Sequence, residues 1–356
     1  MTLAVQLHAS GRLDDAAVIY RQVLRAYPEH PDALSSLAMI ESVRGKQGRA
    51  LQLLRRAIAR VDNNAGYFMN LGAVLDQLEE REAAANAYQR AIELEPQYPD
   101  PYYNLGDLYL REEQPDKAIE VFDACMNAMG REFHALAYKS FALIDAGRLA
   151  EANYLMDIDQ YVRAFPFSAP AGYPSLAAFN EALATHIKTH PTLQANVMST
   201  EHGSHTGELL DGSDNPMSAM LAIIHEAISW YVSQLPDDPQ HPAVRWVPAQ
   251  WKLTSWGVVM NDRGHERPHI HPRGWLSGVF YLTLPEIVVN GSEQHEGWLE
   301  FGRASPDLHV SAPPQPRHFQ PACGQMFLFP SYFYHGTVPF RSQQERICVA
   351  FDVEPV

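Results

Sequence analysis

A 34-residue periodicity in the first half constrains the fold of this chain most strongly. A leucine followed by a small residue recurs at Leu37-Ala38, Leu71-Gly72 and Leu105-Gly106. A second small position is followed four residues later by an aromatic or large apolar residue; the two series are Ala16, Ala50, Ala84, Ala118 and Ala152, and Tyr20, Leu54, Tyr88, Phe122 and Met156. Residues four apart share one helix face, so the small residue lets two helices approach and the larger one fills the gap. The pattern predicts about five stacked helix pairs.

The repeats cover about residues 1–166, and here the chain resembles the tetratricopeptide family. The fifth repeat has Lys139-Ser140 where Leu-Gly is expected, which is typical of a repeat that ends a stack or docks on another domain. A stacked helical array forms a curved groove that commonly receives a peptide or a partner protein, although repeats also serve as dimerisation surfaces. On the concave surface we expect substrate-binding residues from the first helices, namely Asn70, Tyr102, Tyr103, Asn104 and Asp107.

The histidines are distributed unevenly along the chain. Only His8, His30 and His134 precede residue 167, and the rest of the 16 follow it. A histidine-poor half followed by a histidine-rich half suggests a scaffold followed by a site-bearing domain. The segment 165–172 breaks the helical pattern with Pro, Phe and Gly, and is the predicted boundary. A chain of 356 residues is long enough for two such parts, each with its own core.

Charge and cysteine usage exclude several classes of partner. The formal net charge of -15 argues against a nucleic-acid partner and against an anionic membrane surface. The three cysteines are far apart and lack a CxxC spacing, which favours a reducing compartment. The sequence contains no run of about 18 apolar residues, and its start lacks the features of a signal peptide. We therefore expect a cytoplasmic protein without a membrane partner.

After the repeats, the sequence predicts first a helical region and then a β region. Region 167–250 is predicted to be a helical support, with helices over 175–190 and 218–235. His202 and His205 have ligand-like spacing, but the Gly, Ser, His and Asp content of 200–215 favours a polar loop. From residue 251 to 356 short β segments alternate with turn residues, which predicts a sandwich or barrel. We expect strands near 252–260, 277–284, 298–301, 325–329, 333–338 and 346–353.

Candidate metal ligands lie at the start of this β region. His269 and His271 stand one residue apart, directly before an apolar, β-branched and aromatic run. In an extended chain their side chains point to the same side, and neutral imidazoles can hold iron, zinc, copper or nickel. A third histidine, His335, follows downstream, and Arg346 opens the last predicted strand. A guanidinium offers two parallel hydrogen bonds to a carboxylate, and a strand keeps that fork rigid.

Residues 251–356 resemble the 2-oxoglutarate- and iron(II)-dependent oxygenases, and within them a group that often follows tetratricopeptide repeats. The matching residues are Trp256, Pro268-His269-Ile270-His271-Pro272, Leu276-Ser277-Gly278-Val279-Phe280-Tyr281-Leu282, Phe329-Pro330-Ser331, His335, Pro339 and Arg346. The resemblance implies a double-stranded β-helix with iron(II), 2-oxoglutarate and O2 at the mouth between its sheets. It implies His269 and His335 as metal ligands, Arg346 on the far carboxylate of 2-oxoglutarate, and Tyr281 beside the same co-substrate.

The chain departs from this family at one metal ligand. The usual facial triad is two histidines and one carboxylate, but His271 occupies the carboxylate position. Either His271 binds the metal, or it stands behind the ligands and water takes the place. The nearby carboxylates Asp262, Glu266 and Glu300 lack the required spacing. A three-histidine centre carries one more positive charge than the usual one, which leaves the preferred metal open.

Other residues near the site have plain structural alternatives. Arg346 could form a surface ion pair with Glu345 or Asp352 instead of binding a ligand. Cys348 lies two residues after Arg346 and so on the same strand face, where we expect a buried and inert thiol.

Together these patterns predict a multidomain α + β protein, in which an α-solenoid precedes a jelly roll with flanking helices. The first functional hypothesis is an iron(II)- and 2-oxoglutarate-dependent dioxygenase that hydroxylates a peptide or protein side chain recruited by the repeats. The three-histidine set also fits a cupin-like metalloenzyme, such as an isomerase, a hydrolase or a thiol oxygenase. A non-catalytic adaptor with a degenerate barrel is the third hypothesis. The role of Arg346 distinguishes the first two hypotheses, and bound metal distinguishes both from the third.

Overall fold

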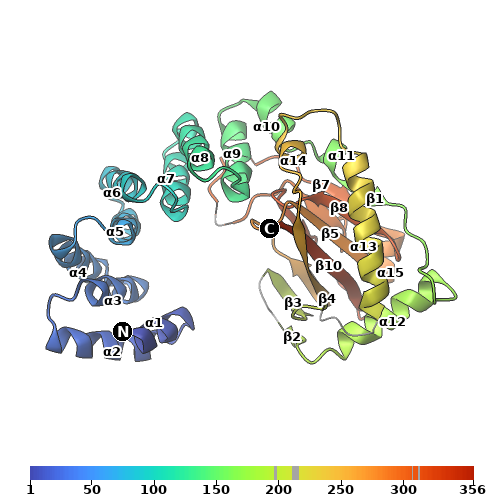
Figure 1. The fold of residues 1–356 in the computed structure, drawn as a ribbon, viewed down its shortest axis with the longest axis horizontal. Helices are drawn as coiled ribbons and strands as arrows, with labels where there is room; N and C mark the ends of the chain where they lie inside the picture. The colour runs from blue at the N-terminus through green and yellow to red at the C-terminus, as the bar shows by residue number, and fades with distance from the viewer. Residues whose placement is uncertain (196–198, 211–215, 307, 312) are drawn as a thin grey trace. The chain divides into compact units, whose positions relative to one another are not determined.

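The computed structural model describes residues 1–195, 199–210, 216–306, 308–311 and 313–356, which form two compact units, Met1–Gly130 and Arg131–Val356. The first unit is built from helices that follow one another in antiparallel pairs (Figure 1). These helices are α1 (Thr2–Ala9), α2 (Leu13–Ala26), α3 (Pro31–Val43), α4 (Gln47–Arg60), α5 (Ala65–Gln77), α6 (Arg81–Leu94), α7 (Asp100–Arg111) and α8 (Pro115–Met129).

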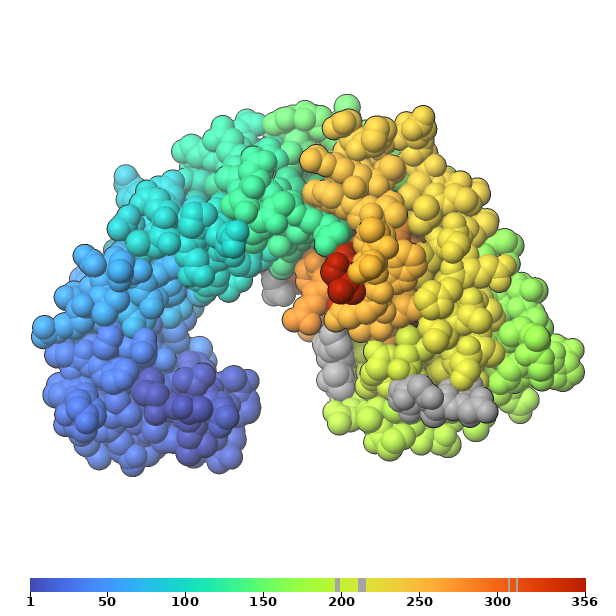
Figure 2. Space-filling view, viewed as in Figure 1, coloured from blue at the N-terminus to red at the C-terminus, as the bar shows by residue number. Residues whose placement is uncertain are grey.

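The repeated small residues pack as the periodicity predicts. The alanines of the series within the first unit are fully buried. Gly72 and Gly106 make room for rings: a Cβ atom would lie 2.5 Å from the Tyr88 ring at the first position and 2.2 Å from the Phe122 ring at the second. Each helix of the first unit packs on the next along the chain. Figure 2 shows the side chains of this unit as one continuous surface, coloured from blue to teal. The small-and-large pattern therefore sets the spacing between helices.

Replacing Gly106 with alanine is expected to lower the stability of the chain by about 1–3 kcal/mol, because the methyl group must displace the Phe122 ring. Gly48→Ala is the matched control, since Gly48 also lies in a helix and a Cβ atom there has no neighbour within 4 Å. That change is expected to stabilise by about 0.5–1 kcal/mol. Urea unfolding followed by circular dichroism measures both effects. Equal midpoints for Gly106→Ala and the unmodified chain would show that the contact is looser than described.

The last helix pair belongs to the second unit. Helices α9 (Phe133–Asp145) and α10 (Leu149–Leu155) pack on the β domain through aromatic contacts. The Phe133 and Tyr332 rings stack with centroids 6.1 Å apart, and Phe141 meets Tyr334 edge-on at 5.3 Å. The degenerate fifth repeat therefore docks on the β domain, as its sequence predicts. The repeat pattern ends near residue 166, but the compact unit changes earlier, after Gly130, because this pair shares its core with the sheets.

The rest of the second unit contains two antiparallel sheets and their covering helices (Figure 1). Strands β1 (Arg163–Phe165), β2 (Gln194–Ala195), β3 (Thr200–His205), β4 (Trp251–Glu266), β5 (Leu276–Thr283), β8 (Met326–Pro330) and β10 (Arg346–Pro355) form the larger sheet in the order β1-β8-β5-β10-β4-β3-β2. Strands β6 (Leu299–Phe301), β7 (Arg317–Phe319) and β9 (His335–Thr337) form the smaller sheet in the order β7-β6-β9. The helices are α11 (Ile158–Tyr161), α12 (Leu176–Lys188), α13 (Pro216–Ser233), α14 (Pro242–Arg245) and α15 (Glu286–Asn290).

The two faces of the larger sheet have different environments. Helix α12 packs on β5 and β4, and α13 lies beside α12 and β1, so these helices cover one face (Figure 1). The other face looks toward the smaller sheet and lines a cavity. Along β10, alternate residues point to the cavity, beginning with Arg346 and Cys348, while Ile347 and Val349 are buried on the opposite side. Within the described residues, no helix is long and apolar enough to cross a membrane.

The observed elements match the predicted fold class and most of the predicted strands. The six predicted strands correspond to β4, β5, β6, β8, β9 and β10, and the two predicted helices correspond to α12 and α13. The polar loop predicted over 200–215 is wrong at its start, because Thr200–His205 is strand β3, paired with β4. Residues 211–215 of that segment lie outside the described residues.

Candidate metal centre

Three histidines from two parts of the β domain converge on one point. His269 and His271 lie in the segment that follows β4, and His335 begins β9. Backbone hydrogen bonds join the two parts: His269 N donates to His335 O at 2.9 Å, and His335 N donates to His269 O at 3.0 Å. The Nε2 atoms of His269 and His271 are 3.0 Å apart, and the possible ligand atoms of all three lie within 4.8 Å of one another.

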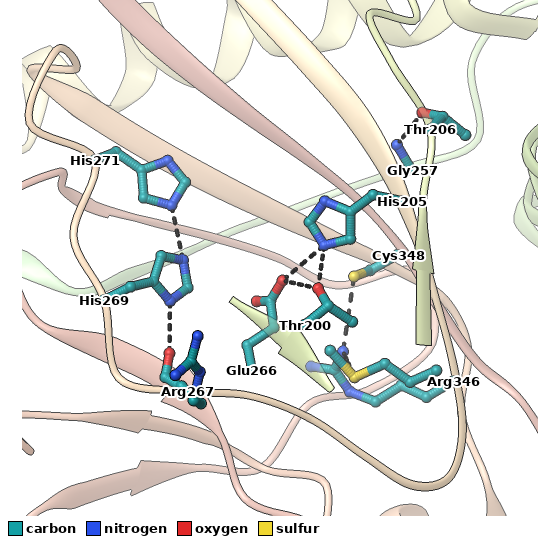
Figure 3. Close-up of polar contacts among 11 residues, drawn as sticks. Thr200, His205, Thr206, Gly257, Glu266, Arg267, His269, His271, Arg346 and Cys348 are labelled. Atoms are coloured by element: carbon teal, nitrogen blue, oxygen red, sulfur yellow. Dashed lines mark hydrogen bonds and ion pairs between the residues drawn. The ribbon is translucent and has the colours of Figure 1, made fainter. Parts of the chain in front are cut away.

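The opposite ring nitrogens are all occupied by hydrogen-bond acceptors. His269 Nδ1 bonds Arg267 O at 2.8 Å, and His335 Nδ1 bonds Phe333 O at 2.9 Å. His271 Nδ1 bonds Asp352 Oδ2 at 2.6 Å. An acceptor at Nδ1 fixes the ring proton there and leaves Nε2 as a lone-pair donor. Figure 3 shows His269 and His271 meeting through these inner nitrogens. The arrangement is the one in which imidazoles bind a metal ion.

The protonation of the rings agrees with this geometry. Burial lowers the pKa of His269 below its ordinary value, and lowers that of His335 further, with the neighbouring imidazoles adding to the effect. Burial also acts against charge on His271, but Asp352 outweighs it and raises the pKa of that ring. Metal binding requires neutral imidazole, so His269 and His335 are ready to bind. Imidazole nitrogens in the neutral form suit iron, zinc, copper or nickel.

None of the three carboxylates near the motif joins the histidines. Asp262 accepts a hydrogen bond from Ser342 N at 3.1 Å. Glu300 is held by Arg303 at 2.6 and 2.8 Å and by His318 at 2.9 Å. Within the described residues the convergent group consists of the histidines alone. Within the described residues, His271 completes the group of three, and no acidic side chain joins it.

Glu266 instead forms a buried polar group with strand β3, which the sequence did not reveal. His205 Nε2 and Thr200 Oγ1 each lie 3.2 Å from Glu266 Oε1 (Figure 3). Burial opposes ionisation of Glu266, but the hydrogen bond with His205 and the nearby histidines outweigh it and lower its pKa. His205 is only 5% exposed. Strand β3 consists of Thr, Glu, His, Gly and Ser and has no apolar alternation, so its sequence pattern does not predict a strand.

Arg346 is buried without a counter-ion among the described residues. It is 2% exposed, and its Nη1 contacts only sulfur atoms, Met260 Sδ at 3.5 Å and Cys348 Sγ at 3.7 Å. Its Nε has no hydrogen-bond partner within the ranges that the structure describes. The surface ion pair considered above is therefore wrong, because Glu345 pairs with Lys188 and Asp352 with His271. A lone buried cation costs several kcal/mol, which an anionic ligand would offset.

Tyr281 and Cys348 complete the wall around this cation. The Arg346 guanidinium lies over the Tyr281 ring at 4.9 Å, and the Tyr281 hydroxyl is buried without a hydrogen-bond partner in the described part of the chain. Burial raises the pKa of the Cys348 thiol to about 11. That thiol is therefore protonated and inert, as expected. The residues predicted to touch a co-substrate thus stand together on β5 and β10.

One cavity contains both the histidines and Arg346. It measures about 460 Å³, which is within the usual range for small-molecule sites. Its lining is largely apolar and includes Trp256, Val258, Val279, Leu299 and Phe329. The cavity therefore holds both a candidate metal-binding group and a buried cation.

A second cavity of about 320 Å³ adjoins the first at His269. One wall comes from α9 of the last helix pair, through His134 and Tyr138. Burial lowers the pKa of His134 to about 4, so this ring is neutral at physiological pH. Arg267 and Tyr334 contribute from the β domain. The histidine group is thus open toward a helix of the repeat pattern.

The residues predicted to line a repeat groove have mixed environments. Tyr102 is 3% exposed, and its hydroxyl donates to Pro96 O at 3.1 Å. It therefore packs inside the array and does not line a surface, which corrects the expectation for this residue. Asn70 donates to Ser35 Oγ at 3.0 Å, and Asp107 accepts from Arg111 Nε at 2.9 Å. Tyr103 and Asn104 are half-buried on the same helix, α7. Substrate binding by these four stays a prediction.

Comparisons with protein families match both parts of the chain. Residues 254–352 match the family described as "Putative 2OG-Fe(II) oxygenase". Tetratricopeptide repeat models match residues 2–65, 77–112 and 99–128. The family match thus begins two residues before Trp256 and ends at Asp352, and it includes all three histidines and Arg346.

Each of the individual relatives is similar to only part of this chain. "Cellulose synthase operon protein C" of Pseudomonas fluorescens (strain SBW25) is 32% identical over 134 residues, which is 35% of this chain and 10% of that protein. The chain spans a fifth or less of the curated relatives it matches first. Among solved structures, MamA is 28% identical with a TM-score of 0.38, covering 43% of this chain and 89% of MamA. A Pseudomonas putida prolyl-4-hydroxylase is 14% identical with a TM-score of 0.39, covering 57% and 97%.

Proposed function

We propose that this chain, in which tetratricopeptide repeats precede a domain of the 2-oxoglutarate- and iron(II)-dependent oxygenase type, is a dioxygenase that hydroxylates a peptide or protein side chain. One observation carries the proposal. The cavity that contains three convergent imidazole nitrogens also contains a buried guanidinium for which the described residues provide no counter-ion. A dicarboxylate with a keto group beside one carboxylate fits such a cavity, because it can bind a metal at one end and a cation at the other.

Each residue has a distinct task in this proposal. His269, His271 and His335 hold iron(II) through Nε2. Arg346 binds the far carboxylate of 2-oxoglutarate, and the Tyr281 hydroxyl donates to the same group. When bound, iron(II) supplies the oxidising chemistry by which O2 and 2-oxoglutarate become CO2 and succinate and one oxygen atom enters a C–H bond of the substrate. The apolar walls exclude water from that reaction.

The second cavity supports a polymeric substrate. It reaches His269 from the side of α9, so a side chain entering there would approach the metal end of the first cavity. Its lining combines aromatic rings with polar groups, which suits part of a peptide. The repeats would recruit the substrate, and the tetratricopeptide family commonly binds peptide segments in this way.

The test uses the full chain with iron(II) and 2-oxoglutarate under anaerobic conditions, followed by addition of O2. We expect 2-oxoglutarate to raise the melting temperature only when metal is present, by an amount that corresponds to about 2.7 kcal/mol at 100 times its Kd. Succinate should form after O2 is added, and faster with a substrate peptide. Glutarate is the matched control, since it has both carboxylates but lacks the keto group. Equal stabilisation by glutarate and 2-oxoglutarate, without succinate formation, would contradict the proposal.

The three-histidine donor set favours a second candidate, a cupin-like metalloenzyme of another reaction class. In that case the protein would bind metal but neither bind nor consume 2-oxoglutarate, and Arg346 would serve another anion. A chain that binds no metal at all would instead be the non-catalytic adaptor. Metal analysis of the purified protein and the keto-acid test above separate the three functions.

A further inference from the structure

The proposed metal centre lacks the negative charge that a carboxylate ligand normally supplies. The usual facial triad contains one carboxylate, whereas here the third position is held by His271, an imidazole that carries no negative charge. The electron density that the imidazoles donate to a metal depends on the hydrogen-bond acceptors at their Nδ1 atoms, because such an acceptor changes the basicity of Nε2. The three histidines differ in this respect. His269 and His335 bond neutral backbone carbonyls, whereas His271 bonds the carboxylate of Asp352.

Asp352 is held so that its charge is directed at His271. It lies on β10, is 7% exposed, and has Ser277 of β5 as its cross-strand neighbour. Oδ2 accepts from His271 Nδ1 at 2.6 Å, and Oδ1 accepts from Ser277 Oγ at 2.6 Å. Ser331 Oγ lies 2.8 Å from Ser277 Oγ and extends the chain of hydroxyl groups. No lysine or arginine among the described residues pairs with Asp352.

The orientation of the His271 ring is fixed from other sides as well. The Trp256 ring stacks on it with centroids 5.4 Å apart and planes 22° apart. The backbone N–H of His271 donates to Ser331 O at 3.0 Å. Gly274 leaves space for this arrangement, since a Cβ atom there would lie 2.5 Å from Ser331 Oγ. The serines of the Ser-Gly-Val and Phe-Pro-Ser segments therefore both serve the contact between Asp352 and His271.

We infer that Asp352 is a positioning residue that supplies, through His271, the negative charge missing from the three-histidine centre. In this arrangement the carboxylate contacts a ligand of the metal, and it does not contact the metal itself. A short hydrogen bond from a ligand imidazole to a carboxylate raises the basicity of that ligand and fixes its orientation. The inference rests on the proposed metal site but not on any turnover of 2-oxoglutarate.

The test is a titration of the metal-free full chain with Co²⁺, and with Fe²⁺ under anaerobic conditions, without 2-oxoglutarate. Asp352→Asn removes the charge and keeps the size of the side chain. We expect metal affinity to fall by about 10- to 100-fold, and the visible Co²⁺ spectrum to shift because the His271 ligand becomes a weaker donor. Glu354→Gln is the matched control. Glu354 lies two residues further on the same strand, pairs with Lys252 at 2.8 Å, and should leave both readouts unchanged when neutralised.

A merely structural role would give a different result. It would lower the melting temperature of metal-free protein without changing the Co²⁺ spectrum or the affinity of the folded fraction. Ser277→Ala keeps the charge but releases Oδ1 of Asp352, and we expect it to weaken metal binding by about 2- to 10-fold. If Asp352→Asn does not fold, Ser277→Ala decides alone, and unchanged affinity there overturns the inference.

The outcomes separate this inference from the proposed function. If the unmodified chain binds neither Co²⁺ nor Fe²⁺, the metal centre itself is wrong, and the proposed function fails with it. If the unmodified chain binds metal and Asp352→Asn binds it equally well with the same spectrum, only the inference about Asp352 is overturned.

Discussion

Replacing Arg346 with methionine is expected to remove the binding of 2-oxoglutarate while the protein stays folded and still binds its metal. Arg346 is 2% exposed, and its guanidinium contacts two sulfur atoms and the Tyr281 ring but no carboxylate among the described residues. The far carboxylate of the co-substrate would be its counter-ion. Removing one partner of a buried charge pair costs about 2–5 kcal/mol, which corresponds to a loss of affinity of about 30-fold or more.

Without 2-oxoglutarate, the same substitution should leave the stability of the fold unchanged or raise it. A buried charge without a partner destabilises a fold, and replacing buried ionic groups with apolar residues of similar size is often neutral or stabilising by about 1–4 kcal/mol. Methionine fills much of the space of the arginine chain and can contact the same sulfur-rich wall. The variant should therefore melt at the same temperature as the unmodified chain or higher. Adding 2-oxoglutarate should then stabilise only the unmodified chain.

Calorimetric titration of metal-loaded, oxygen-free protein with 2-oxoglutarate measures the affinity, and melting curves with and without the keto acid measure the stability. Arg341→Met makes the same chemical change at an exposed position five residues earlier and should leave both readouts unchanged. Arg346→Lys keeps a charge but loses the bidentate fork, so intermediate binding is expected. A methionine variant that binds 2-oxoglutarate with unchanged affinity would count against the oxygenase and in favour of the cupin-like alternative.

The sequence predicts the helical repeats and the order of the site motifs well, because both depend on local spacing. Ala16 and its successors at 34-residue intervals are buried as the pattern requires. The alternation along β10 likewise places Cys348 on the same face as Arg346, and both line the cavity. Side chains on one helix or strand are positioned by a fixed geometry, so their relation can be read from residue numbers.

Contacts between distant segments could not be predicted in this way. Asp352 lies 81 residues after His271, and their hydrogen bond depends on the register of β10 against β5, which no short pattern specifies. From the sequence, Asp352 is only a possible partner of Arg346. The sequence predicts a polar loop around His205, because strand β3 lacks apolar alternation. Helix periodicity predicts Tyr102 on the groove surface, but it does not determine the hydrogen bond that the Tyr102 hydroxyl donates to the Pro96 carbonyl.

Replacing His335 with alanine is expected to have the largest effect on metal binding. His335 is 6% exposed, and its ring lies 4.4 Å from the His269 ring and 4.6 Å from the Phe329 ring, centroid to centroid. Mutating a residue that hydrogen-bonds to a metal ligand lowers metal affinity by about 10- to 100-fold. Removing a ligand itself should lower the affinity more. We therefore expect the affinity for Fe²⁺ or Co²⁺ to fall by more than about 100-fold.

The variant should nevertheless fold. The backbone bonds between His335 and His269 do not involve the side chain, so β9 keeps its pairing with the segment that carries the other two histidines. The missing ring leaves a cavity that costs roughly 2–5 kcal/mol at most, as for other large-to-small core changes. Circular dichroism and a melting curve of the metal-free protein check this. Titration with Co²⁺ and metal analysis after dialysis measure the binding.

His318→Ala is the matched control for this prediction, because His318 lies on β7 of the same small sheet and bonds Glu300 at 2.9 Å, outside the histidine group. It should retain metal and 2-oxoglutarate-dependent succinate formation, whereas His335→Ala should lose both. If His335→Ala held metal as tightly as the unmodified chain, the three rings would not share one ion. Arg346 would then need a ligand other than 2-oxoglutarate. The proposed pose of 2-oxoglutarate requires a metal at the histidines to bind its keto-acid end while Arg346 binds its far carboxylate.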